Sequence, residues 1–127
     1  FVREQCLENC VFFTGFIPNA AQLHSAFAIY LSTSIKEGLP YTLIEAMHNG
    51  IPIIAPRVGG IPDAITHGVS GHLIAPRSSD AVTDALVYLL TDRAYRARLG
   101  RNAHTEALNT YTTSAMAEKT FALYETC

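Results

Sequence analysis

The sequence predicts an α/β fold, with a Rossmann-like parallel sheet and helices on both of its faces. Short apolar runs alternate with longer helical stretches, which is the pattern of successive βαβ units. The run AIYLST at 28–33 is unbroken rather than alternating, as expected for a strand that is covered on both faces. The connecting stretches are short, and 127 residues suffice for one domain with a single core.

Each expected strand is a short run rich in aliphatic, β-branched or aromatic residues. The run CVFFTG is stopped by Gly15, and IPIIA lies directly after another glycine. The four expected strands are residues 10–15, 28–33, 51–55 and 71–75.

The expected helices are marked by capping residues and by periodicity. A helix over 40–49 ends at Gly50, because glycine suits the position after a helix. The stretch 78–92 has its apolar residues at helical spacing, and Ser79 or Asp80 caps its start. The other expected helices are 19–27 with Asn19 as N-cap, a short one within 58–65, 93–108, and 113–125, the last packing on the body through Phe121 and Tyr124.

The composition indicates a globular protein without a nucleic-acid partner. Hydrophobic residues make up 49% and the formal net charge is −2. No apolar run approaches the roughly 20 residues of a membrane span, and no signal peptide opens the chain. Three cysteines (Cys6, Cys10 and Cys127) and five scattered histidines lack metal-site spacing. We therefore expect reduced thiols, no metal and a cytoplasmic location.

Two glutamates flank a turn at the expected ligand-binding edge of the sheet. Glu37 and Gly38 follow the strand 28–33, and ligands of open parallel sheets bind beyond the carboxyl ends of the strands. Gly38 has no Cβ, so a ligand can approach its backbone closely. Glu45 lies eight residues after Glu37. Carboxylates accept hydrogen bonds from hydroxyl groups, which a nucleoside diphosphate sugar carries on both sides of its diphosphate.

The helix that follows this turn offers a place for the diphosphate. Pro40 suits the first helical turn, and the N–H groups of Tyr41, Thr42 and Leu43 then face outward. An alternative explains the same residues without a ligand. Thr42 and Glu45 match a capping box, and Glu37 can be a solvated loop residue. The spacing alone leaves both interpretations open.

A longer series of motifs resembles a known family. The segment EGLPYTLIEAMHNGIPIIAPRVGGIPDAITHGVSGHLIAP, preceded by VFFTGFIPNAAQL, is similar to retaining glycosyltransferases of family 4, which have the two-domain GT-B fold. The resemblance covers nearly the whole chain. It implies that residues 1–127 are a single, incomplete nucleotide-sugar-binding domain, and that the N-terminal acceptor domain is absent.

The resemblance assigns roles to residues that match the family's motifs. Glu37 is the implied catalytic residue and contacts the donor sugar, while Glu45 contacts the ribose hydroxyls. Backbone N–H groups of the intervening turn bind the donor's sugar and diphosphate, and main-chain groups of an earlier loop recognise the base. The donor-binding residues are Gly15, Phe16, Ile17, Glu37, Gly38, Leu39, Tyr41, Thr42 and Glu45. Pro40 departs from the glycine of many members and offers no N–H.

The implied reaction moves a hexosyl group from a nucleotide diphosphate sugar to an acceptor hydroxyl, without a metal or other cofactor. The implied partners are this donor and a carbohydrate or lipid-linked acceptor, which the missing domain binds. The chain alone is then expected to be inactive. The alternative is a non-catalytic nucleotide- or sugar-binding module. A nicotinamide-binding domain fits poorly, because no G-x-G-x-x-G is present.

A group of arginines remains outside this interpretation. Four of the nine basic residues crowd one expected helix: Arg93, Arg96, Arg98 and Arg101. A solvated helix face is the favoured interpretation. The alternative is an anionic partner, such as a peripheral contact with the inner face of the membrane.

Overall fold

The computed structural model describes residues 1–125, except for the side chain of Ala21, and contains a parallel three-stranded sheet. Its strands are β1 (Tyr30–Leu31), β2 (Ile53–Pro56) and β3 (His72–Ile74), in the order β1-β2-β3. Tyr30 pairs with Ile53, and Ile54 pairs with His72. The α/β fold class is confirmed, although each of these strands is shorter than the run that predicted it.

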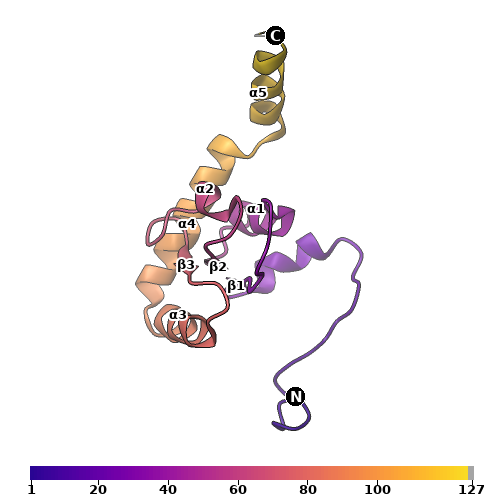
Figure 1. The fold of residues 1–127 in the computed structure, drawn as a ribbon, viewed down its shortest axis with the longest axis vertical. Helices are drawn as coiled ribbons and strands as arrows, with labels where there is room; N and C mark the ends of the chain where they lie inside the picture. Colours follow the sequence, from indigo (N-terminus) through magenta and orange to yellow (C-terminus); the bar gives the residue numbers. More distant parts are fainter. Residues whose placement is uncertain (126–127) are drawn as a thin grey trace.

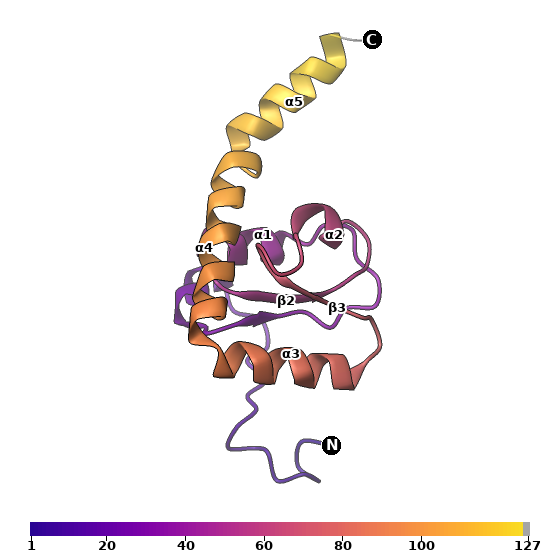
Figure 2. The same cartoon turned by 90° about the vertical axis from the view of Figure 1, so that its left-hand side faces the viewer.

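Helices lie on both faces of this sheet, as predicted. Figure 2 shows α1 and α2 on one face, α3 on the other, and α4 along the side of the body. The helices are η1, a 3₁₀ helix (Ala20–Ala26), α1 (Tyr41–His48), α2 (Ile61–Ala64), α3 (Ser79–Thr91), α4 (Arg93–Thr110) and α5 (Thr113–Glu125). None of the helices described here is long and apolar enough to cross a membrane.

The two faces of the central strand β2 build two hydrophobic clusters. Every residue of β2 is buried. Ile53 and Ala55 belong to the cluster beneath α1 and α2, whereas Ile54 belongs to the cluster over α3. Because successive side chains of a strand point to opposite faces, an unbroken apolar run supplies both clusters at once. Helix α4 contributes to both, through Ala103 and Leu99 respectively.

The expected strand at 10–15 is wrong. Cys10 belongs to a turn, and residues 11–15 form an exposed segment without regular secondary structure, away from the body and near the N-terminus (Figure 1). Phe12 and Phe13 are 76% and 85% exposed. A strand needs a neighbour for its backbone hydrogen bonds, and within residues 1–125 no strand pairs with this segment.

The last helix does not pack on the body as expected. Helix α5 projects from it (Figures 1 and 2), and none of its described residues is buried. Phe121 and Tyr124 are both largely exposed. Of the three cysteines, Cys6 and Cys10 are free and exposed, while Cys127 lies outside the described residues.

The helix ends agree with the sequence in part. Gly50 follows α1 with a φ of +65°, as expected for glycine after a helix. Ser78 caps α3 by accepting a hydrogen bond from the Ala81 N–H at 3.1 Å, so the expected caps Ser79 and Asp80 are wrong by one or two residues. Asn19 precedes η1 without a side-chain cap.

Helix α4 approaches the end of α1 through a pair of glycines. A Cβ at Gly100 would overlap the carbonyl oxygen of Gly50. Gly100→Ala is therefore expected to lower the free energy of unfolding by about 1–3 kcal/mol, although alanine is the better helix former. Asn109→Ala, at an exposed position of the same helix, is the control and should change it by less than about 0.5 kcal/mol in urea unfolding. Equal stability of the two variants would contradict the close approach.

Candidate functional site

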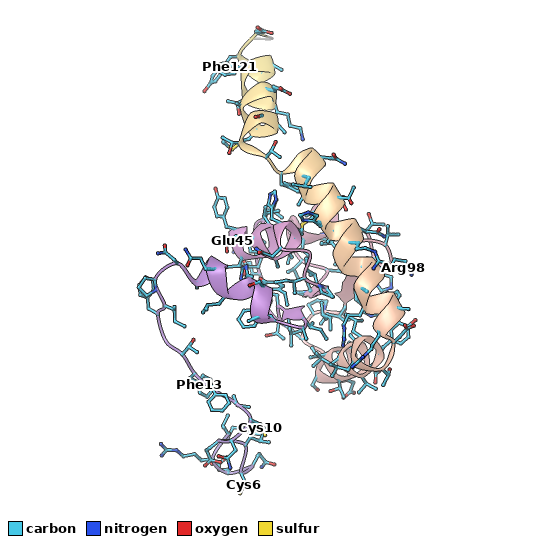
Figure 3. The ribbon with its side chains drawn as sticks, turned by 180° about the vertical axis from the view of Figure 1, so that it is seen from behind. Cys6, Cys10, Phe13, Glu45, Arg98 and Phe121 are labelled. Carbon is cyan, nitrogen blue, oxygen red and sulfur yellow. The ribbon has the colours of Figure 1, made fainter. Side chains whose placement is uncertain are left out.

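The candidate site lies at the carboxyl edge of the sheet, where the loop after β1 leads into α1. Glu37, Gly38 and Leu39 lie in this loop, and Tyr41 begins the helix. Glu45 follows one helical turn later and is labelled on α1 in Figure 3. The structure thus brings together the predicted residues 37–45 on one turn and the start of one helix.

The carboxylate of Glu37 is held by neighbouring hydroxyl groups. The Ser34 hydroxyl donates to Oε1 of Glu37 at 2.8 Å. The Ser34 side chain lies in turn 3.4 Å from the Ser32 hydroxyl, which also accepts from the Ser34 N–H at 3.5 Å. Glu37 is half-buried. It is therefore an oriented carboxylate rather than a freely solvated loop residue.

The glycine turn after β2 packs against the backbone of the Glu37 turn. The Gly60 N–H donates to the Gly38 carbonyl oxygen at 2.8 Å. Gly59 has a φ of +53°, and a Cβ at this position would overlap the carbonyl oxygen of Glu37. The two turns touch backbone to backbone, which only glycine permits at this distance.

Gly38 differs from Gly59 because the fold does not require it. Its φ lies outside the left-handed region, and a Cβ there would meet no atom within 4 Å. The residue is exposed and carries its carbonyl toward Gly60. A glycine in open space leaves the backbone accessible, which a closely approaching ligand would use.

The start of α1 has bare amides and no side-chain cap. Pro40 is the N-cap, and its carbonyl accepts the N–H of Leu43 at 3.1 Å. The prediction that the Leu43 N–H faces outward is therefore wrong. Within residues 1–125, no hydrogen bond satisfies the N–H groups of Tyr41 and Thr42. Two backbone donors and the positive end of the helix dipole remain at this edge of the sheet.

The capping box does not form. Because the helix begins at Tyr41, Thr42 is its second residue and cannot cap it. The Thr42 hydroxyl instead pairs with the Tyr30 hydroxyl at 2.8 Å. Glu45 is half-buried as a residue, and among the described residues its carboxylate accepts no hydrogen bond and joins no ion pair. Glu45 therefore does not act as a capping residue in this structure.

A hollow of about 520 Å³ adjoins this turn and was not predicted from the sequence. Leu39 lines it from the turn and Tyr41 from the start of α1, while Tyr111 lines it from the junction of α4 and α5 and Lys119 from α5. Burial raises the pKa of the Tyr111 hydroxyl. No sequence signal connects these groups, because they lie some seventy residues apart and meet only in the folded chain.

A second hollow, of about 360 Å³, lies at the same edge of the sheet. Thr33, Pro56 and Ile74 contribute to it from the ends of the three strands, and Ser78 from the start of α3. No sequence signal identifies these residues as a group, because each is an ordinary strand or cap residue when taken alone.

The residues predicted to recognise a base are not assembled with the rest. Gly15, Phe16 and Ile17 lie on the segment before η1, and Phe16 is 93% exposed. Within residues 1–125, no hydrogen bond connects them to residues 37–45. Their role stays a prediction.

His72, whose pKa is lowered, lies on β3 at the edge of the three-stranded sheet. Burial lowers the pKa of His72 on β3, and the charges of His67 and Arg57 lower it further. His72 Nδ1 lies 3.3 Å from the hydroxyl of Tyr95, whose pKa is raised, first by burial and then by Tyr88. The described residues contain no group of three or more His, Cys, Asp or Glu side chains that could hold a metal.

Residues 2–106 match the family described as "Glycosyl transferases group 1". This match covers most of the chain, and the Glu37 turn and α1 lie within it. The chain therefore belongs to the group 1 glycosyl transferases.

Curated relatives agree with this assignment. N-acetyl-alpha-D-glucosaminyl L-malate synthase of Bacillus anthracis is 34% identical over 98% of this chain and 32% of its own length. D-inositol 3-phosphate glycosyltransferase of Corynebacterium glutamicum is 36% identical over 80% of this chain and 24% of its own. The chain thus spans about a third or less of the length of these relatives.

Solved structures have the same arrangement of strands and helices. Sucrose-phosphate synthase of Thermosynechococcus elongatus superposes with a TM-score of 0.90 at 30% identity, over 98% of this chain and 32% of that one. HepE of Anabaena, crystallised with UDP, superposes with a TM-score of 0.93 at 26% identity, over 99% of this chain and 35% of that one. HepE has also been crystallised with UDP-glucose. The structural neighbours are GT-B glycosyltransferases.

The two glycines at the site are expected to respond differently to the same change. Gly59→Ala should lower the free energy of unfolding by about 1–3 kcal/mol, because the new methyl group overlaps the backbone of Glu37. Gly38→Ala is the matched control and should change it by less than about 0.5 kcal/mol, because its methyl group meets open space. Urea unfolding of both variants measures the difference. A Gly38→Ala variant as unstable as Gly59→Ala would contradict the assignment of Gly38 as free of the fold.

Proposed function

We propose that this chain is the donor-binding part of a retaining glycosyltransferase of family 4. It transfers a hexosyl group from a nucleotide diphosphate sugar to the hydroxyl of a carbohydrate or lipid-linked acceptor, which a second domain binds. The observation that carries the proposal is the Glu37–Glu45 turn. Within residues 1–125, it combines an oriented carboxylate, a glycine that the fold does not need, two backbone N–H groups without an acceptor and a second carboxylate without a hydrogen-bond or ion-pair partner.

Each of these groups suits one part of the donor. Glu37 accepts hydrogen bonds from hydroxyls of the sugar and holds the anomeric carbon toward the acceptor. Glu45 accepts from the ribose hydroxyls. The amides of Gly38, Leu39, Tyr41 and Thr42 are the proposed donors to the sugar and diphosphate, and Gly15, Phe16 and Ile17 recognise the base. Support for this class of ligand comes from HepE, a structural neighbour that was crystallised with UDP-glucose.

The chemistry asked of this edge is electrostatic. Transfer forms a bond between the anomeric carbon and the acceptor oxygen and releases a nucleoside diphosphate, on which negative charge grows as the bond between the anomeric carbon and the phosphate oxygen breaks. The amides of Tyr41 and Thr42 and the dipole of α1 are oriented before the reaction, so they stabilise that charge without reorganising. The proposal therefore requires no metal or other cofactor. The chain alone is expected to bind a donor but not to turn it over, because the acceptor is bound elsewhere.

The alternative is a nucleotide- or sugar-binding module without catalysis. It uses the same residues for binding and differs only in the absence of transfer. Calorimetric titration with UDP, GDP and their glucose and mannose esters establishes whether a donor binds, and which base and sugar it carries. Turnover by a longer form that contains the acceptor domain then distinguishes the enzyme from the module. Absence of binding to every nucleotide would overturn both.

Glu45→Ala is expected to weaken UDP binding roughly tenfold to a hundredfold, because charged hydrogen bonds to the ribose are lost. Its free energy of unfolding should change by less than about 0.5 kcal/mol, since Glu45 caps nothing. Glu118→Ala on the exposed face of α5 is the control and should change neither quantity. A loss of about 1 kcal/mol in stability with unchanged UDP affinity would revive the capping explanation.

Ser34→Ala tests how the carboxylate of Glu37 is held. Without the 2.8 Å hydrogen bond, that carboxylate loses its orientation toward the sugar. We expect the affinity for UDP-glucose to fall about fivefold to tenfold, while the affinity for UDP stays unchanged. Ser34→Thr keeps the hydroxyl and should restore most of the difference. Equal losses for both ligands would indicate a general disturbance of the loop instead.

A further inference from the structure

A third hollow lies at the amino edge of the sheet, opposite the candidate donor site. Its volume is about 610 Å³. Ala28 and Pro52 lie just before β1 and β2, and Asn49 and Gly50 follow the end of α1. One face of α4 forms the remaining wall. The lining residues are Ala28, Asn49, Gly50, Pro52, Arg93, Arg96, Ala97, Arg101 and His104.

The polar side chains of this hollow are mostly basic. Three arginines line it, together with His104 and Asn49, but no aspartate or glutamate does. The whole chain has a formal net charge of −2, so this concentration of positive charge is local. Among the described residues, no ion pair neutralises any of the three guanidinium groups. Like charges held together in one concave surface repel one another, and a bound anion would relieve that repulsion.

Two of the basic groups are oriented by the fold. Arg96 donates from Nη1 to the Leu89 carbonyl oxygen at 3.3 Å. His104 donates from Nδ1 to the His48 carbonyl oxygen at 2.7 Å, which leaves Nε2 without a hydrogen-bond partner within residues 1–125. The close contact of Gly100 with Gly50 fixes the α4 wall against the floor of the hollow. The α4 side of the hollow, with Arg96 and His104, is thus ordered before any ligand binds.

The fourth arginine of the helix makes a useful contrast. Arg98, labelled in Figure 3, donates to the Gly68 carbonyl oxygen at 3.3 Å and lies over the ring of Tyr95. It does not line the hollow. The arginines of α4 therefore divide into one that contacts the β3 side of the domain and three that share a single concave surface.

We propose that this hollow binds a phosphate-bearing anion. A guanidinium group matches two phosphate oxygens with two parallel hydrogen bonds, and Arg93, Arg96 and Arg101 provide three such groups. His104 adds a donor at Nε2 when its ring is protonated. The site is separate from the donor site, since the two lie at opposite edges of the sheet, so it goes beyond the proposed transferase function. The phosphate belongs either to a soluble polyphosphate or to a phospholipid headgroup.

Binding of inorganic tripolyphosphate and of phosphatidylglycerol vesicles tests this site in the full chain. Calorimetry follows the first probe and vesicle co-sedimentation the second, with phosphatidylcholine vesicles as the neutral reference. Arg93→Gln/Arg101→Gln changes two exposed residues of the hollow. Arg3→Gln/Arg98→Gln removes the same number of charges from exposed positions outside it.

The first variant should lose about tenfold or more in affinity for the probe that binds, and the second less than about twofold. Binding of tripolyphosphate alone identifies a soluble ligand, and binding of phosphatidylglycerol vesicles alone identifies a lipid headgroup. Equal losses of affinity in the two variants would show that the net charge of the chain, and not this hollow, determines binding, and would overturn the proposal. The absence of binding to both probes would overturn it as well. UDP titration of the Arg93→Gln/Arg101→Gln variant should be unchanged, so this result is independent of the donor-site proposal.

Discussion

The contact between two turns at the carboxyl edge of the sheet is the constraint on which the candidate site depends. The turn after β2 touches the turn after β1 backbone to backbone, through Gly59 and Gly60 on one side and Glu37 and Gly38 on the other. Any side chain at Gly59 would separate them. Because β1 and β2 are neighbouring parallel strands, the chain after each emerges at the same edge, and the contact follows from the order of the sheet.

This contact explains why the Glu37 turn is ordered and yet stays accessible to a ligand. Gly60 holds the backbone of the Glu37 turn through a hydrogen bond to the Gly38 carbonyl, and Ser34 holds the Glu37 carboxylate. Neither contact covers the solvent-facing side of the turn. Gly38 leaves the backbone of the turn open to solvent, because it has no side chain and a Cβ there would meet no atom within 4 Å. A site that binds a flexible, polar ligand gains affinity when its own groups are ordered in advance, since less conformational entropy is lost on binding.

The sequence predicted the central part of the fold well, because the signal there is local. Continuous apolar runs identified β1, β2 and β3, and Gly50 identified the end of α1. The errors at residues 10–15 and at α5 came from features that depend on distant partners. Residues 10–15 have the composition of a strand, but pairing is a property of the folded sheet, and no neighbour is present among the described residues.

The same distinction applies to the candidate site. Glu37 and Glu45 were recognisable from their spacing and from the family's motifs, whereas the choice between capping and binding depended on where the helix begins. The helix begins at Tyr41, two residues too early for Thr42 to act as its N-cap. The role of Gly59, the hollow beside Leu39 and the shared wall of three arginines all required the folded chain, because each joins segments that are far apart in sequence. Motifs thus identified the candidate binding residues, while packing determined which of them the fold itself needs.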